Sequence, residues 1–276
     1  MLNAFFVVWR ESLEALLIVG ILYAWLAAND PGGKGKRALF AGVGAGVALA
    51  FALGWGLLHA QDELTGEALE IFQIAALAVA AALITQMVIW MSVHGREIKS
   101  DLEGRIERAS EAGGQWGIAV VAALAVAREG AETVIFLYSL AQGGDMQALA
   151  AGSVGGFAAA ILTAWLAAKS LGRLRLGTLL KISSVLLLVL ASSLLVAASD
   201  RLIGMDWLPA LVDPVWDASA LVDDGGGFGR ALADFAGYRA RPALTTLLVW
   251  LAYWLLALTP LVWLSRRARA HTPATA

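Results

Sequence analysis

Two short stretches of the chain place charged residues in the middle of long apolar runs. The pattern Arg-Glu-x-x-Glu occurs at residues 10–14 inside the apolar run 4–27, and again at residues 128–132 inside the run 117–140. Each run is long enough to cross a bilayer as a helix, which takes about 20 residues. A charged side chain in mid-membrane costs roughly 2.5–3.5 kcal/mol on insertion scales. These charged groups are therefore expected to pair, to face the protein interior or to line water.

The residue types and their spacing favour the binding of a hard cation. Residues three and four apart share a face of an α-helix, so each copy directs two carboxylates and one guanidinium to the same side. Oxygen-only ligation suits hard cations and disfavours soft ones. The groups concerned are the carboxylates of Glu11, Glu14, Glu129 and Glu132 and the guanidiniums of Arg10 and Arg128.

A purely structural role for the two patterns is the alternative. The Arg–Glu pairs four residues apart would then be intrahelical ion pairs that fasten two helices. The extra carboxylates of Glu11 and Glu129 argue against this role, because an ion pair does not need them. Charged residues inside membrane segments also mark functional sites by default.

The composition places the chain among polytopic membrane proteins. Of its 276 residues, 59% are hydrophobic and 15% are charged, and the mean hydropathy is +0.73. A net charge of −2 and the lack of a basic run beside aromatic residues argue against nucleic-acid binding. The absence of cysteine excludes disulfides and thiolate metal sites, and three histidines disfavour imidazole-rich zinc or copper chemistry.

Seven apolar spans can be distinguished, and membrane lipid is their expected surroundings. They cover roughly 4–27, 38–60, 69–93, 117–140, 147–169, 179–199 and 244–265. The first, third and fifth connections and the tail are rich in Lys and Arg, whereas the second, fourth and sixth are acidic. The positive-inside rule then puts the N-terminus outside and the C-terminus in the cytoplasm, in a multi-pass protein of the cytoplasmic (inner) membrane.

Two connections are predicted to have structure of their own. Residues 95–116 are mixed in charge, and the four-residue spacing of Ile98, Leu102 and Ile106 predicts a short interfacial helix. Residues 200–242 contain several Pro and Gly breakers and are expected to form an external cap. Two tryptophans in this cap, Trp207 and Trp216, suit a membrane–water boundary.

An internal repeat organises the first six spans. The charged pattern recurs, Gly42 and Gly46 match Gly152 and Gly156, and a tryptophan follows the first glycine at the same offset in both copies, as Trp55 and Trp165. Three spans per repeat invert the second copy in the membrane, an architecture common in transporters. The predicted fold is therefore all-α, with seven transmembrane helices arranged as a 3+3 inverted repeat plus one helix. The predicted domains are 1–94, the first repeat; 95–116, the cytoplasmic connection; 117–199, the second repeat; 200–242, the periplasmic loop; and 243–276, the seventh helix and tail.

With these motifs, nearly the whole chain resembles the oxidase-dependent iron permease family, which includes the bacterial Efe-type iron uptake permease. Paired Arg-Glu-x-x-Glu motifs in the first and fourth spans carry the resemblance. Residues 85–91 are similar to the family's third helix, and Val215–Ser219 with Gly237-Tyr238 are similar to its last external segment.

The resemblance implies that the chain imports iron, with ferric iron as the expected ion. By matching position, the metal ligands would be Glu11, Glu14, Glu129 and Glu132. Iron would be the transported substrate, and no permanently bound cofactor is expected. Related permeases take iron from an external oxidase or iron-binding protein, so a periplasmic partner of that kind is expected.

Three acidic residues outside the two motifs resemble an accessory outer site of the family. Glu67 and Glu70 begin the third span, and a solvated helix start explains them equally well. Asp217 begins an Asp-Ala-Ser sequence that the family continues with an acid, whereas Ala220 follows here. That departure weakens the case for metal handover at Asp217.

Two other functions remain open at this point. A permease for manganese or another divalent metal would use the same carboxylates. An intramembrane carboxylate-bridged di-iron enzyme normally uses Glu-x-x-His motifs, and neither copy here contains a histidine.

Overall fold

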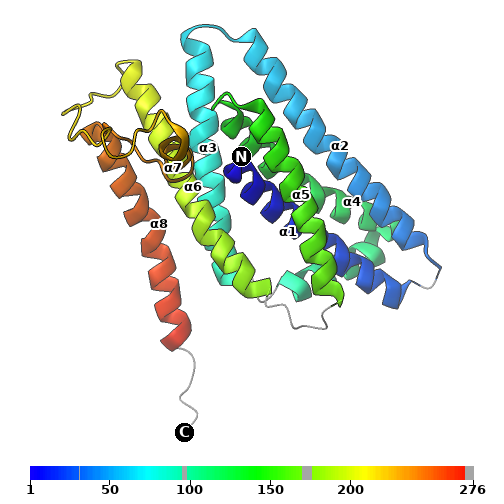
Figure 1. Ribbon diagram of the computed structural model, residues 1–276. Coiled ribbons are helices and arrows are strands. Elements are labelled where there is room, and N and C mark those ends of the chain that lie inside the picture. The colour runs from blue at the N-terminus through cyan, green and yellow to red at the C-terminus, as the bar shows by residue number, and fades with distance from the viewer. Residues whose placement is uncertain (31, 95–97, 170–175, 271–276) are drawn as a thin grey trace. The chain divides into compact units, whose positions relative to one another are not determined.

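The regular structure of the chain is helical. A computed structural model describes residues 1–30, 32–94, 98–169 and 176–270, and in this part of the chain it contains eight α-helices and no strand (Figure 1). The helices are α1 (Leu2–Asn29), α2 (Lys34–Glu63), α3 (Glu67–His94), α4 (Ile98–Ala141), α5 (Met146–Lys169), α6 (Leu176–Gly204), α7 (Gly227–Ala236) and α8 (Leu244–Ala270).

Four of the described helices are long and apolar enough to cross a membrane. They are α2, α3 over Glu67–Val93, α5, and α6 over Thr178–Gly204. A shorter apolar stretch, Leu244–Pro260, begins α8. The chain is therefore an all-helical integral membrane protein, while the crossing of α1, α4 and α8 stays a prediction.

The helices group into two compact units that alternate along the chain. Unit 1 consists of Met1–Leu69 and Arg96–Ser183, and unit 2 of Glu70–Gly95 and Ser184–Ala276. Unit 1 therefore contains α1, α2, α4 and α5, which carry both charged motifs. The predicted domains follow the sequence repeat rather than these spatial groups, and they stay a prediction.

In unit 1, α2 packs closely along α4 through two glycines. A Cβ atom on Gly42 would overlap the carbonyl oxygen of Ala119, and a Cβ on Gly46 would lie 2.7 Å from that of Ala123. Only glycine lets the two backbones approach this closely.

The packing of α5 along α1 follows the same pattern. A Cβ on Gly152 would overlap the carbonyl oxygen of Met1, and a Cβ on Gly156 would overlap that of Phe5. In both interfaces, the two contacted carbonyl groups lie nine and five residues before the motif arginine of the same helix. They are those of Ala119 and Ala123 before Arg128, and those of Met1 and Phe5 before Arg10. The two helix pairs therefore meet in the same register relative to their charged motifs.

Helix α4 bends sharply near its middle. Gly114 has φ 54° and ψ −132°, a backbone conformation that favours glycine, and Gly117 packs against the backbone of Ala109. The segment before the bend contains the predicted interfacial helix. Its apolar residues Leu102 and Ile106 are buried in the core of unit 1, at 9% and 0% exposure, so this face of the connection packs on protein.

In unit 2, the residues between α6 and α8 form a folded cap. Asp200 of α6 accepts a hydrogen bond from Arg239 at 2.6 Å and one from Thr246 at 2.7 Å. The carbonyl oxygen of Asp234, in α7, accepts a hydrogen bond from Ser193 of α6 at 2.9 Å. The predicted external loop 200–242 thus includes the last turn of α6 and all of α7. Trp207 and Trp216 are about half exposed in it.

Candidate metal-binding site

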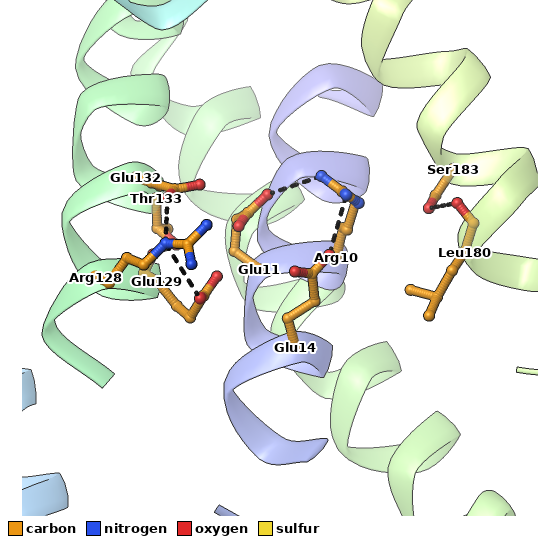
Figure 2. A network of polar contacts seen from close by, with 9 residues as sticks. All are labelled: Arg10, Glu11, Glu14, Arg128, Glu129, Glu132, Thr133, Leu180 and Ser183. Atoms are coloured by element: carbon orange, nitrogen blue, oxygen red, sulfur yellow. Dashed lines mark hydrogen bonds and ion pairs between the residues drawn. The ribbon is translucent and has the colours of Figure 1, made fainter. Parts of the chain in front are cut away.

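The two charged motifs meet inside unit 1. One carboxylate oxygen from each of Glu11, Glu129 and Glu132 lies within 4.8 Å of the others, and all three residues are buried (Figure 2). Among the described residues this is the one group of three or more acidic, His or Cys side chains so arranged. Helix α1 supplies the first carboxylate, and α4 supplies the other two at i and i+3 spacing.

Each motif arginine binds the second glutamate of its own helix. Arg10 lies 3.1 Å from Glu14 and 3.6 Å from Glu11. Arg128 lies 3.1 Å from Glu132 and 3.9 Å from Glu129 (Figure 2). The Arg–Glu pairs expected from the four-residue spacing are therefore present in both helices.

Several oxygens of the cluster are buried without a hydrogen bond among the described residues. They include both carboxylate oxygens of Glu11 and the Oε2 atoms of Glu129 and Glu132. A buried carboxylate oxygen with no donor is costly, and a bound cation removes that cost. This geometry therefore favours a cation-binding role over purely structural ion pairs.

The spacing of the cluster suits one small cation. Oxygen ligands bind first-row divalent ions at about 2.0–2.2 Å, so three oxygens spread evenly around one ion lie about 3.6 Å apart. Movements of under about 1 Å would bring Glu11, Glu129 and Glu132 to that separation. Glu14 lies on the same α1 helix beside Arg10, outside this group of three (Figure 2). Its role as a fourth ligand stays a prediction.

The acidic residues of the predicted accessory outer site belong to no such group among the described residues. Glu67 is exposed, and Glu70 forms an ion pair with Arg201 at 3.2 Å. Asp217 accepts hydrogen bonds from Ser219 and from Arg241, at 3.0 Å for the arginine. These bonds, those from Ser219 first, lower the pKa of Asp217 to about 2. Glu70 and Asp217 therefore already have cationic partners.

Sequence reasoning missed a polar pair near the motif in α4. The Tyr138 hydroxyl donates a hydrogen bond to Gln61 of α2 at 2.6 Å, and Tyr138 is 6% exposed. Ser139, seven residues after Glu132 on the same face of α4, is 2% exposed. One indication of these groups was present in the sequence: Tyr138 and Ser139 are polar residues in the apolar run that contains the second motif.

Buried carboxylates that converge from two helices of an integral membrane protein are typical of cation transporters. The model of the iron permease FTR1 family matches residues 1–268 of the chain. The chain belongs to this family, and it is a transporter rather than an enzyme.

Relatives that align with most of the chain occur in bacteria and archaea. The chain is 28% identical, over 94% of both lengths, to a protein of Escherichia coli O6:H1 named ferrous iron permease EfeU. A Yersinia pestis protein of the same name is 28% identical over 92% of this chain and 90% of its own. An uncharacterised protein of Archaeoglobus fulgidus is 30% identical over 92% and 91%. No solved structure matches the chain.

Proposed function

We propose that the chain imports iron across the cytoplasmic membrane and that its two Arg-Glu-x-x-Glu motifs hold the ion in transit. One observation carries this proposal: buried carboxylates from both motifs converge to within 4.8 Å and leave oxygens without donors. The family membership and the names of the relatives support iron as the substrate. The ligands are Glu11, Glu129 and Glu132, with Glu14 as the fourth.

The charge of the cluster favours ferrous iron at this position. Four ionised glutamates and two arginines sum to −2, which a divalent ion neutralises and a trivalent ion overcompensates. Buried charge is tolerated best where it is paired. The sequence resemblance implied ferric iron, while the relatives are named ferrous iron permeases. Manganese has the same charge and the same preference for oxygen ligands, so it is the natural competitor.

The proposed topology has seven spans, with α1–α3 and α4–α6 as inverted repeats and α8 outside them. The matching registers of the two glycine interfaces support the repeat. Leu39 of α2 is buried in one cluster with Leu102 and Ile106 of α4, so the starts of these two helices lie at the same end of unit 1. These starts contain Lys and Arg residues of the first and third connections. The positive-inside rule then makes that end cytoplasmic and puts the N-terminus outside.

A periplasmic iron-binding or iron-oxidising protein is proposed as the donor of iron. The folded cap between α6 and α8 is the largest external segment in the proposed topology, and it is acidic. Such a partner would deliver iron to the cap at the outer surface.

Radioactive iron uptake into cells that lack other iron importers tests this function. Native chain, Glu132→Gln and Glu129→Gln would be compared at equal membrane levels, with ferrous and ferric iron supplied separately and manganese as competitor. Glu107→Gln is the matched control, because Glu107 is an exposed glutamate of the same helix.

Uptake should fall to background in Glu132→Gln and Glu129→Gln and stay native in the control. Ferrous iron should be the better substrate when the partner is absent. Native uptake in both motif variants would refute the site.

A further inference from the structure

One end of unit 1 is closed by a cluster of buried apolar side chains, called here the apolar plug. Its members come from α1, from the start of α2 and from both segments of α4. They are Leu22, Leu26, Leu39, Leu102, Ile106, Ile118 and Ala122, and none is more than 9% exposed.

The plug lies on one side of the carboxylate cluster along both motif helices. In α1, Leu22 and Leu26 follow Glu14 by eight and twelve residues, or about 12 and 18 Å of helix. In α4, Ile118 precedes Glu129 by eleven residues, or about 16 Å. The two helices run in opposite directions, so these distances lead to the same end of the unit.

The other side of the carboxylate cluster has buried polar groups. Ser139 follows Glu132 by two helical turns and is 2% exposed, and its neighbour Tyr138, 6% exposed, donates a hydrogen bond to Gln61 of α2. A cation can exchange its water for such groups, whereas a hydrocarbon layer offers it no ligand. Buried polar groups therefore occur on this side of the cluster, among apolar residues such as Val7 and Phe136, whereas every member of the plug is apolar.

One wall of the plug is attached through a glycine bend. Leu102 and Ile106 belong to the segment of α4 before Gly114, and the rest of the plug belongs to α1, α2 and the segment after it. The opposite face of this first segment is polar and exposed, with an ion pair between Arg105 and Asp101 at 2.9 Å. A rotation at Gly114 would move this segment relative to the rest of α4 and would require the Ala109 backbone to leave Gly117.

We infer that residues 98–113 form the gate through which the ion leaves the carboxylate cluster, with Leu102 and Ile106 as the side chains that hold it shut. This inference rests on the proposed function, which supplies the ion and the direction. Opening would separate Leu102 and Ile106 from Leu26, Leu39 and Ile118, so that water reaches the plug. A hydrophobic constriction of this kind blocks ions by excluding water.

Passive iron leak from proteoliposomes tests the gate without any partner protein. Vesicles loaded with ferrous iron under ascorbate, with a chelating dye outside, report the leak rate of native chain, Ile106→Ala and Leu102→Ala. The leak should rise about tenfold or more in both variants, because truncating a buried plug residue leaves a cavity and weakens the closed state. Glu107→Ala, on the exposed face of the same segment, should leak like the native chain.

The double variant Ile106→Ala with Glu132→Gln separates the gate from the proposed function. Its leak should return to background if iron passes the carboxylates before the gate. A leak that persists would refute both proposals, because the ion would then bypass the site. No rise in Ile106→Ala and Leu102→Ala, in protein that still imports iron, would overturn the gate and leave the proposed function standing.

Cysteine labelling tests the gate without weakening it. The chain has no cysteine, so Ala122→Cys introduces one small thiol into the plug, and Ala112→Cys introduces an exposed control. A water-soluble maleimide should label Ala122→Cys at least about tenfold more slowly than the control. The difference should shrink when ferrous iron is added. Equal labelling without iron would show that the plug is open and would overturn the gate.

Discussion

The two copies of the charged motif have the same chemistry and different surroundings. In both, the arginine lies 3.1 Å from the second glutamate. The Arg10 side chain is completely buried, however, whereas the Arg128 side chain is 50% exposed. A repeated motif therefore need not have a repeated role, and we predict that Arg10 is a structural counter-charge whereas Arg128 is released from Glu132 when a cation binds.

The largest difference in stability is expected between the variants Arg10→Ala and Arg128→Ala, which test this comparison directly. Arg10→Ala leaves buried carboxylates without their counter-charge, and breaking a buried ion pair in this way costs about 3–5 kcal/mol of stability. Arg128→Ala removes a half-exposed partner, so its cost is expected to be about 1 kcal/mol or less.

Denaturant unfolding of the two purified variants in detergent measures the difference. Equal losses of unfolding free energy would mean that the two arginines have the same role and would break the comparison. A larger loss in Arg128→Ala would reverse it.

Substitutions at the glycine interfaces are expected to have smaller, equal effects. Gly46→Ala puts a methyl group against the Ala123 carbonyl, and Gly156→Ala puts one against the Phe5 carbonyl. Forcing two close helices apart costs typically about 1–3 kcal/mol. The same unfolding assay should give similar losses, because both interfaces have the same register. Gly44→Ala, with open space around its Cβ position, is the control and should not destabilise. Unequal losses of unfolding free energy in Gly46→Ala and Gly156→Ala would show that the two helix interfaces differ, as the two arginines do.

The smallest effect on stability is expected when the exposed ion pair between Asp217 and Arg241 in the cap is removed. The folded-state pKa of Asp217, about 2, lies below the usual value near 3.9. A lowered pKa stabilises the fold above the unfolded value, and this contribution is lost as the pH falls towards about 2. The unfolding temperatures of native chain and Asp217→Asn should therefore differ slightly and by a constant amount from pH 7 to 5. A difference that disappears already between pH 7 and 5 would contradict this assignment.

Much of the site could be predicted from sequence, because helical spacing alone fixes which side chains share a face. The charged motifs, the intrahelical Arg–Glu pairs and the paired glycines all follow from intervals of three and four residues. The iron permease family and the transporter class were predicted by the same residues and are confirmed by the family match.

The burial of individual side chains and the grouping of the helices could not be predicted from the sequence, because both depend on contacts between distant helices. The spacing of Arg10 and Arg128 is identical, and only their neighbours in space make one buried and the other half exposed. The four-residue spacing of Leu102 and Ile106 predicted an apolar face but not what covers it. The alternation of the two compact units along the chain likewise arises from packing that no local pattern records.

The intrahelical ion pairs also matter for how the chain is made. Glu132 follows Glu14 by 118 residues, so in the proposed topology α1 would enter the membrane long before α4 is synthesised. At about 5–20 residues per second, ribosomes need about 6–24 s to produce the second motif. During that interval Arg10, one helical turn from Glu14, is a counter-charge carried by the same helix. In the proposed topology, each charged helix would therefore enter the membrane with one of its two carboxylates already paired.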